Sequence, residues 1–408
     1  MAKRHLMELA VLLCAAVLIF CAFAGTETEP AEGGGETESV GTGGETGPAL
    51  AGGQSEPAGT GGDFPSLIEV IRITPPLDFC GEPVPLENPE VAERLETELL
   101  LMTWNRPQVI LWLKRAGRYF PEIEAILKQE GLPDDLKYLA VVESGLRPHA
   151  GSSAGAVGFW QFIRPTAKRY GLTVDGRKDL RRNLTASTRA ATRYFKDLYA
   201  RFGSWHLAAA AYNMGEQGLA AEMLAQEVDD YYRLYLYLET QRYVPKAVAV
   251  KLIMSDPRRF GFRLGPGDVY APYEAESVAV TLAEEVPLQL LAQAGNCDFK
   301  AVKDLNPELR GHYLGAGLHS LKIPPGGADG FHQRLERLLA EHQDQLEERI
   351  YVVQPGDNLS AIAERFGVPL QALRIWNRID LKKPIHPGER LVVRPAREAL
   401  TSDENEQQ

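Results

Sequence analysis

The sequence predicts a mainly α-helical domain followed by two small α+β modules. Within the first domain, predicted over residues 64–262, apolar residues recur at helical spacing, and no stretch between residues 89 and 255 alternates convincingly. The pattern then changes. Residues 275–326 and 350–395 each follow the order strand, helix, helix, strand. We interpret this order as an internal repeat.

The N-terminal region is expected to direct export. Lys3 and Arg4 precede an apolar run from Leu9 to Phe20, and the following Ala-Phe-Ala fits a cleavage site, so residues 1–24 are predicted to be a signal peptide. A retained anchor is the alternative, although the run is short for a membrane span. Residues 25–63 are rich in Gly and Glu and lack Lys and Arg, which predicts a disordered linker. A disordered tail is expected over residues 396–408.

The cysteines leave two questions open. A lipid-attachment site needs a small residue before its cysteine, but Cys14 and Cys21 both follow a large apolar residue. Membrane tethering through the N-terminus therefore stays an option within an exported, periplasmic or envelope location. Cys80 and Cys297 could form a disulfide in an oxidising compartment. They could equally be two unrelated buried thiols, which we favour.

Net charge and the absence of ligand-spaced pairs argue against nucleic acid, metal and cofactor. The 408 residues are 44% hydrophobic, enough for two or three domains with their own cores. A formal net charge of −11 argues against nucleic acid as a partner. No His-x-His or Cys-x-x-Cys pair occurs, so we expect no metal and no cofactor.

Proline positions organise the first part of the helical domain. Leu67–Ile73 is predicted to be an extended apolar segment. A helix is expected to begin at Pro89, after an asparagine that can cap it, and Pro107 and Pro121 indicate two further helices. Residues 189–202 have the pattern of an amphipathic helix.

A short helix with a carboxylate on its apolar face is predicted between Asp134 and Gly145. Asp134 is a candidate N-cap, and Gly145 is a natural end. Glu143 shares one face of this helix with Leu136 and Leu139, so it should point inward at the helix end.

An inward-facing Glu143 suits acid catalysis. Burial disfavours the charged form of a carboxyl group and raises its pKa. A carboxylic acid that is protonated near neutral pH is the general acid that cleavage of a glycosidic bond needs. The alternative is an ordinary surface residue at a fraying helix end, or one paired with Arg147, and helix spacing alone does not decide between them.

Further residues with chemical potential follow along the chain. The small-residue loop Gly151–Ala156 would let the backbone approach a bulky ligand. It leads to Gly158-Phe-Trp-Gln161, which brings an aromatic ring and an amide close to the acid. Ala211-Tyr-Asn213 lies in a helical stretch, and Tyr243 follows further on.

Four tyrosines precede Tyr243 at short intervals. They could form a wall on which sugars stack, or they could be packing residues, and helical spacing favours packing for most of them. These residues are Tyr231, Tyr232, Tyr235 and Tyr237.

Glu143-Ser144, Gly158–Gln161, Ala211–Asn213 and Tyr243 stand in the order of motifs in the family 1 (SLT-type) lytic transglycosylases, which this chain resembles over residues 85–395. The resemblance implies a goose-type lysozyme-like fold. It also implies peptidoglycan as substrate, with cleavage of the N-acetylmuramic acid (MurNAc)–β-1,4–N-acetylglucosamine (GlcNAc) bond and formation of 1,6-anhydro-MurNAc ends. Many members have Leu-Met where this chain has Phe-Trp, which exchanges one apolar wall for another.

The resemblance also implies roles for individual residues. Glu143 would be the only general acid and base, because the substrate supplies the nucleophile. Tyr243 would approach Glu143 and support the charge that develops in the transition state. The other implied substrate-binding residues are Ser152, Gly158, Trp160, Gln161, Tyr212 and Asn213.

The second copy of the repeat resembles a LysM module, which binds glycans that contain GlcNAc. The match lies in Tyr351–Ser360, Trp376-Asn377 and Pro387-Gly388. A turn and a helix cap would explain the same glycine and aspartate without a ligand. The implied glycan-binding residues are Gly356, Asp357, Asn358, Leu359, Ile379 and Asp380.

The first copy is expected to be a degenerate module with a packing role. It has Ala283–Val286 where the second copy has its Pro-Gly-Asp turn, although both copies place an asparagine after the second helix (Asn306 and Asn377). The charged helix predicted over Phe331–Arg349, between the copies, is expected to be solvated.

Two other functions compete with the transglycosylase interpretation. A hydrolytic muramidase would need a second carboxylate, but Asp175 and Asp179 lie in a polar stretch where they are more typical of caps or surface groups. A non-catalytic scaffold that binds peptidoglycan would not need a desolvated acid at Glu143.

Overall fold

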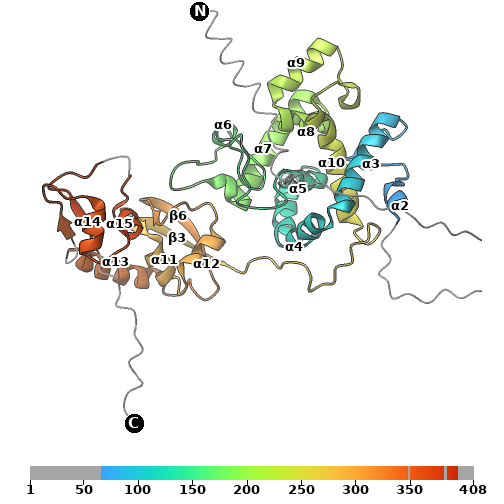
Figure 1. Cartoon of the computed structure of the whole chain (residues 1–408). Coiled ribbons are helices and arrows are strands. Elements are labelled where there is room, and N and C mark those ends of the chain that lie inside the picture. The colour runs from blue at the N-terminus through green and yellow to red at the C-terminus, as the bar shows by residue number, and fades with distance from the viewer. Residues whose placement is uncertain (1–65, 348–349, 381–383, 394–408) are drawn as a thin grey trace, which may run out of the picture. The chain divides into compact units, whose positions relative to one another are not determined.

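The computed structural model describes residues 66–347, 350–380 and 384–393, and Figure 1 shows the arrangement of their helices and strands. The predicted signal peptide, linker and tail lie outside these residues. Contacts divide the chain into two units. One comprises the described residues up to Gly171 together with Leu184–Ala271, and the other comprises Leu172–Asn183 together with the described residues from Pro272 onward.

The first unit is built from helices, as the sequence predicts. A short hairpin pairs β1 (Asp78–Phe79) with β2 (Glu82–Pro83), and two 3₁₀ turns, η2 (Asp134–Leu136) and η4 (Tyr231–Arg233), connect helices. The helices are α2 (Leu67–Ile71), α3 (Pro89–Trp104), α4 (Arg106–Gln129), α5 (Lys137–Ser144), α6 (Arg164–Arg169), α7 (Leu184–Phe202), α8 (Trp205–Met214), α9 (Glu216–Gln226) and α10 (Leu238–Ser255).

Helix α10 is the central support of this unit. It packs against α3, α5 and α8, while α4 packs against α5 and α7. Ala208–Ala211 of α8 and Ala247 and Val248 of α10 are fully buried, and small side chains such as alanine let packed helices approach closely. In Figure 1 the short α5 consequently lies among α4 and α10.

The expectations for α2 and for the middle of α4 are wrong. Leu67–Ile71 is helical, not extended, although only Val70 in it is buried. Pro121 does not begin a new helix, because α4 runs through it without interruption. A proline inside a helix loses one backbone hydrogen bond, and burial of the neighbouring Phe120 and Ile123 offsets that loss.

The second unit contains the two predicted modules. The first is β3 (Glu276–Leu282), α11 (Leu288–Ala294), α12 (Phe299–Leu305) and β6 (Gly317–Ile323), with a small hairpin of β4 (Val286–Pro287) and β5 (Tyr313–Leu314). The second is β7 (Ile350–Val352), α14 (Leu359–Arg365), α15 (Leu370–Asn377) and β8 (Arg390–Val392). The outer strands of each module pair antiparallel, from Glu276 opposite Ile323 in the first and from Ile350 opposite Val392 in the second. The unit also holds η3 (Leu180–Arg182) and α13 (Phe331–Glu347).

Equivalent asparagines fasten both modules with the same three hydrogen bonds. Asn306 donates to the carbonyls of Val302 and Lys322, at 2.7 Å each, and accepts from the Lys322 amide at 2.8 Å. Asn377 donates to the carbonyls of Leu373 and Val392, at 2.9 Å each, and accepts from the Val392 amide at 2.6 Å. One side chain therefore ties the second helix to the last strand in both copies, which supports the internal repeat.

Helix α13 differs from the expectation of a solvated connector. Phe331 and Leu335 are buried against the core of the first module. The many charged residues further along this helix make its composition look polar, although its first turns carry an apolar face.

The remaining observations concern thiols and membrane spans. Cys80 and Cys297 are free thiols. Among the described helices, none is long and apolar enough to cross a membrane.

Candidate active site

The end of α5 fixes the position of Glu143. Leu136 and Leu139 are fully buried, so the predicted apolar face does point inward. Gly145 ends the helix in the left-handed conformation, with φ of 57°. A Cβ at this glycine would meet the Trp112 indole nitrogen at 2.8 Å, so both the backbone angle and the space require glycine. Asp134 is not the N-cap, because it lies inside η2 and its carboxylate binds Lys137.

Tyr243 donates its phenolic hydrogen to Glu143 Oε1 at 2.5 Å. The two residues come from adjacent helices, α5 and α10, and are 100 positions apart in the chain. The resemblance implies this approach. A bond this short is typical of a hydroxyl that donates to a carboxyl oxygen.

Burial raises the pKa of Glu143 from 4.5 to about 7. The hydrogen bond from Tyr243 and the charge of Lys246 lower this pKa, whereas the charge of Glu239 raises it. The group therefore exchanges its proton near neutral pH, although one hydrogen bond and one cation favour the anion.

Glu239 and Lys246 are charged neighbours of Glu143 that the sequence reasoning missed. Both lie on α10, four residues before and three residues after Tyr243, and residues at these spacings share a helix face. The signal was available once Tyr243 had been singled out, because the same face had only to be followed by one turn in each direction.

The loop after α5 is held by its own polar side chains. Gln161 donates from Nε2 to the carbonyl of Gly158 at 2.8 Å and to that of Ala150 at 3.2 Å. Ser152 Oγ accepts from the amide of Ala156 at 3.1 Å. The Gly158 amide donates to Ala150, and the φ of Gly158 is 86°. Ser152, Gly158 and Gln161 thus give the loop its shape.

Trp160 departs from the expectation of a wall that contacts substrate. Its side chain is 1% exposed, and its indole N–H donates to Thr188 Oγ1 at 2.9 Å. Its ring meets that of Phe195 edge-on. A ring enclosed in this way packs under the loop within the core, and neither of its faces is exposed for a sugar to stack on.

Tyr212 and Asn213, at the end of α8, connect the loop and α10. The Tyr212 hydroxyl donates to the Trp160 carbonyl at 2.6 Å, and its ring stacks on Phe195. Burial raises the pKa of Tyr212 well above its ordinary value, and the nearby Glu143 charge adds to the effect. Asn213 Oδ1 accepts from Thr240 Oγ1 at 2.8 Å, which ties α8 to the first turn of α10.

The residues implied to bind glycan in the second module form a turn whose polar groups hold one another. Asp357 Oδ2 accepts from the Tyr351 hydroxyl and from the Gln354 amide, at 2.7 Å each. Asn358 caps α14 by accepting from the Ala361 amide at 2.9 Å. Gly356 has φ of 91°. The turn-and-cap explanation therefore accounts for these three residues. The other implied residues are Leu359, which packs on the module core and begins α14, and Ile379 and Asp380, which follow α15.

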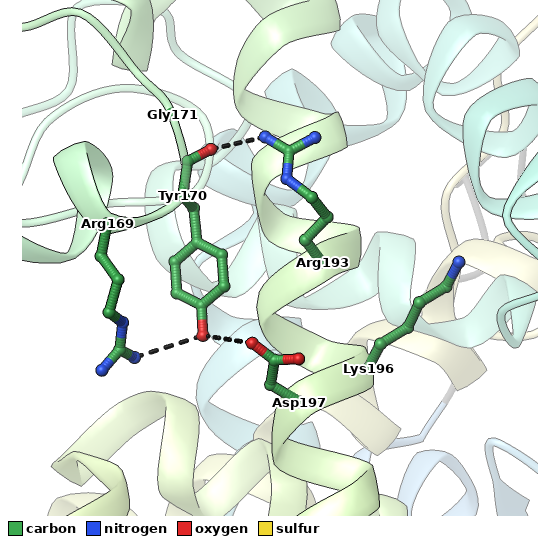
Figure 2. A pocket seen from close by; sticks show the side chains of 6 residues that line it. All are labelled: Arg169, Tyr170, Gly171, Arg193, Lys196 and Asp197. Carbon is green, nitrogen blue, oxygen red and sulfur yellow. Dashed lines mark hydrogen bonds between the residues drawn. The ribbon is translucent and has the colours of Figure 1, made fainter.

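A hollow of about 490 Å³ on the first unit is lined by none of the residues predicted to bind substrate. Figure 2 shows that Arg193 donates to the Tyr170 carbonyl, and that the Tyr170 hydroxyl lies between Arg169 and Asp197. Arg169 also binds Glu216 through two nitrogens, and Lys196 binds Glu130. Because its cations already have anionic or carbonyl partners, the hollow does not compete with the Glu143 site.

Comparisons with known proteins show which families and proteins this chain resembles. A family model described as a transglycosylase SLT domain matches residues 120–231, and a LysM domain model matches residues 351–394. The membrane-bound lytic murein transglycosylase D of Escherichia coli strain K12 is 33% identical over 294 residues. The alignment covers 68% of this chain and 64% of that protein. The protein of the same name from Escherichia coli O6:H1 gives the same values.

Solved structures give weaker matches. An inactive mutant of the lytic transglycosylase Slt from Pseudomonas aeruginosa is 18% identical, with a TM-score of 0.27, and covers 37% of this chain and 26% of its own. The 70 kDa soluble lytic transglycosylase of Escherichia coli is 17% identical, with a TM-score of 0.31, and covers 48% and 41%. TM-scores this low give no support for a shared fold, so the fold assignment rests on the family models and on the helices described above.

The family models and the curated relatives both indicate similarity to lytic transglycosylases. The chain spans 64% of the length of the curated relatives, a little under two thirds. Residues 120–231 are similar to transglycosylase SLT domains and residues 351–394 to LysM domains, and 68% of the chain aligns with the membrane-bound lytic murein transglycosylase D of Escherichia coli.

Proposed function

We propose that this chain is a peptidoglycan lytic transglycosylase with Glu143 as its only general acid and base. The observation that carries the proposal is the hydrogen bond between Glu143 and Tyr243, made by a carboxyl group whose pKa is raised to about 7 by burial. Such a group can give up a proton and take one back at the same pH.

In the first step, protonated Glu143 donates its proton to the glycosidic oxygen between MurNAc and GlcNAc. The bond from the anomeric carbon of MurNAc to that oxygen breaks, and GlcNAc leaves with a free 4-hydroxyl group. Positive charge develops on the MurNAc ring as in an oxocarbenium ion. The Glu143 carboxylate formed in this step and the Tyr243 oxygen are the nearby groups that can stabilise this charge.

In the second step, the C6 hydroxyl of the same MurNAc attacks its own anomeric carbon. Glu143, now a carboxylate, accepts the proton of that hydroxyl, and a 1,6-anhydro ring forms. No water is consumed, and the carboxyl group returns to its starting state. Lys246 and Tyr243 both favour the anion, so they stabilise Glu143 between the two steps.

The neighbouring residues would bind the sugar through groups that the loop does not use. We propose that Ser152, Gly158 and Gln161 contact the glycan along the loop, and that Tyr212 and Asn213 contact the muramoyl residue. The hydrogen bonds within the loop support this proposal, because a site that is held in shape before binding loses less entropy when the glycan binds.

A second carboxylate would favour a hydrolytic muramidase, and one candidate is present. Asp175 accepts from the amides of Arg177 and Lys178, and Asp179 is buried and paired with Arg181, so both serve their own loop. Glu239, in contrast, acts on the charge of Glu143. A water molecule activated by Glu239 would give hydrolysis instead of ring closure.

The LysM module would hold the enzyme on its substrate. We propose that its glycan-binding residues are Gly356, Asp357, Asn358, Leu359, Ile379 and Asp380, while the first module serves packing. Peptidoglycan as substrate further requires export to the periplasm or envelope, in line with the signal peptide predicted from the sequence.

Digestion of purified sacculi tests the proposal. Mass spectrometry of the released muropeptides should find 1,6-anhydro ends, which are lighter by one water than reducing ends. Glu143→Gln should release nothing, and its unchanged circular dichroism would show that folding is intact. Reducing ends, together with loss of activity in Glu239→Gln, would instead establish the muramidase. Binding without release of any product by the wild type would establish the scaffold.

A further inference from the structure

The loop before α10 combines exposed aromatic rings with a backbone held in place. Tyr235 is 82% exposed and Tyr237 is 58% exposed, whereas Leu234 and Leu236, each directly before one of these tyrosines, are buried. The alternation resembles that of a strand, with two leucines turned inward and two tyrosines turned outward. Neighbouring exposed aromatic side chains form an apolar patch, and such patches can mark ligand-binding surfaces.

Side-chain amides fix the backbone of this loop. Gln226, the last residue of α9, accepts from the Tyr235 amide at 2.8 Å and donates to the Tyr235 carbonyl at 2.9 Å. Gln241, in α10, donates to the Leu236 carbonyl at 2.5 Å. The Tyr231 hydroxyl donates to the carbonyls of Thr240 and Gln241. Because their backbone is fixed, Tyr235 and Tyr237 lose little conformational entropy when a ligand stacks on them.

The loop is continuous with the Glu143 site. Tyr237 is the N-cap residue of α10, and its carbonyl accepts from the Gln241 amide. The first turn of α10 also carries Glu239, which raises the pKa of Glu143, and Thr240, which binds Asn213. At 1.5 Å per residue, Tyr237 lies about 9 Å along the helix axis from Tyr243.

The charge around the loop selects among possible occupants. Residues 222–239 contain five acidic side chains and one basic one. Such a surface repels anionic phospholipid, which needs clustered Lys and Arg. The GlcNAc units of a glycan strand are uncharged and have no such requirement, and the apolar faces of their rings can stack on aromatic side chains.

We propose that Tyr235 and Tyr237 form a sugar-stacking platform that binds the glycan strand beyond the bond cleaved at Glu143. This inference rests on the proposed function and adds a binding position to it. The platform acts on strands long enough to reach it from the site. It contributes to substrate binding and takes no part in bond cleavage.

Steady-state kinetics on peptide-free glycan strands of defined length test the platform in the full chain. The double variant Tyr235→Ala/Tyr237→Ala should raise KM for long strands about tenfold, which corresponds to 1.4 kcal/mol, and leave kcat unchanged. The shortest strands that are cleaved should show no difference. The double Phe variant keeps both rings and should match the wild type. Trp104→Ala removes an equally exposed ring (82%) from α3 and serves as the control.

Chemical protection gives a second measurement that needs no change to the tyrosines. In the inactive Glu143→Gln full chain, nitration by tetranitromethane should modify Tyr235 and Tyr237, and long glycan strands should protect both. Tyr199, which is 38% exposed and stacks on Trp205, is the internal control and should react equally with and without glycan.

The outcomes separate the platform from the proposed function. If the wild type releases anhydro ends while KM for long strands stays within about twofold in the double Ala variant, a change worth less than 0.5 kcal/mol, the platform is wrong and the transglycosylase stands. Unprotected Tyr235 and Tyr237 would lead to the same conclusion. If the wild type cleaves no glycan, both proposals fall.

Discussion

Two carboxyl groups in this chain each accept a hydrogen bond from a tyrosine, yet their pKa values are shifted in opposite directions. In the helical unit, Tyr243 donates to Glu143 at 2.5 Å, and in the LysM module Tyr351 donates to Asp357 at 2.7 Å. The pKa of Glu143 is raised to about 7, whereas the pKa of Asp357 is lowered below 3.8. A hydrogen bond from tyrosine favours the anion in both pairs.

Burial makes the difference. Glu143 lies at the end of a buried helix, and desolvation outweighs its hydrogen bond. Asp357 is open to water and gains a backbone N–H from Gln354 as well, so hydrogen bonding dominates. The first arrangement keeps the Glu143 carboxyl group protonated up to about pH 7, and the second holds the turn around Asp357 in place. A tyrosine–carboxylate contact alone therefore does not identify a catalytic acid.

The largest expected difference between the pairs is in turnover. Glu143→Gln should lower kcat on sacculi at least about 1,000-fold, because general acid and general base are lost together. Asp357→Asn should leave kcat on soluble glycan fragments unchanged. Release of anhydro-muropeptides, followed by mass spectrometry, measures both. Turnover retained by Glu143→Gln would remove this residue from the catalytic role.

Removing the two tyrosine hydroxyls gives the next largest contrast. Tyr243→Phe should lower kcat about 100- to 1,000-fold, in the range seen when one preorganised donor at a reacting centre is removed. It should also move the alkaline limb of the pH–rate profile upward, because the lost hydrogen bond had lowered the pKa of Glu143. Tyr351→Phe is the matched control and should change neither quantity. A profile that does not shift in Tyr243→Phe would show that the bond does not set the acidity of Glu143.

The pH dependence of the wild type should follow Glu143 and not Asp357. The free enzyme needs a protonated acid, so kcat/KM should fall as pH rises through about 7. Asp357 stays ionised throughout this range, since its pKa lies below 3.8. Initial rates on soluble glycan between pH 5 and 9 measure the limb. A kcat/KM that is flat across neutral pH would contradict the assignment.

The smallest expected effect is on stability, where the two variants should have opposite signs. The folded-state pKa of Glu143 is raised from 4.5 to about 7, so the wild type loses stability as pH rises through that window. Glu143→Gln escapes this loss and should be more stable at pH 8 by about 1–3 kcal/mol.

Asp357 has a lowered folded-state pKa, so its contribution to stability exists at neutral pH and disappears as pH falls through that pKa, below 3.8. Asp357→Asn should therefore be less stable than wild type at pH 7 and equal to it in strong acid. Thermal melting of the full-length variants across pH measures both signs. The same sign in both variants would refute burial as the cause of the contrast.

The sequence predicted the parts of the molecule in which local signals agree with packing. The inward face of α5, its end at Gly145 and the two strand–helix–helix–strand modules follow from spacing and turn residues alone. The pairing of Glu143 with Tyr243 came from family resemblance, because nothing local links residues 100 positions apart.

The sequence could not predict features that tertiary contacts decide. Pro121 is tolerated inside α4 because its neighbours are buried, and Trp160 is enclosed because Thr188 and Tyr212 bind its indole nitrogen and its carbonyl. The influence of Glu239 on Glu143 depends on how α10 packs on α5. These outcomes depend on partners that are remote in the chain.

The asparagine that fastens each module is also a possible site of deamidation, and the residue after it decides how readily the reaction occurs. Deamidation would replace the two N–H donors of Asn306 or Asn377 with an oxygen that faces two carbonyls. The common route to deamidation closes a ring through the backbone nitrogen of the next residue. Pro307 has no hydrogen on that nitrogen and blocks the route in the first module, whereas Arg378 leaves it open in the second. Slow loss of the amide during long storage would therefore loosen the LysM module and spare its degenerate neighbour.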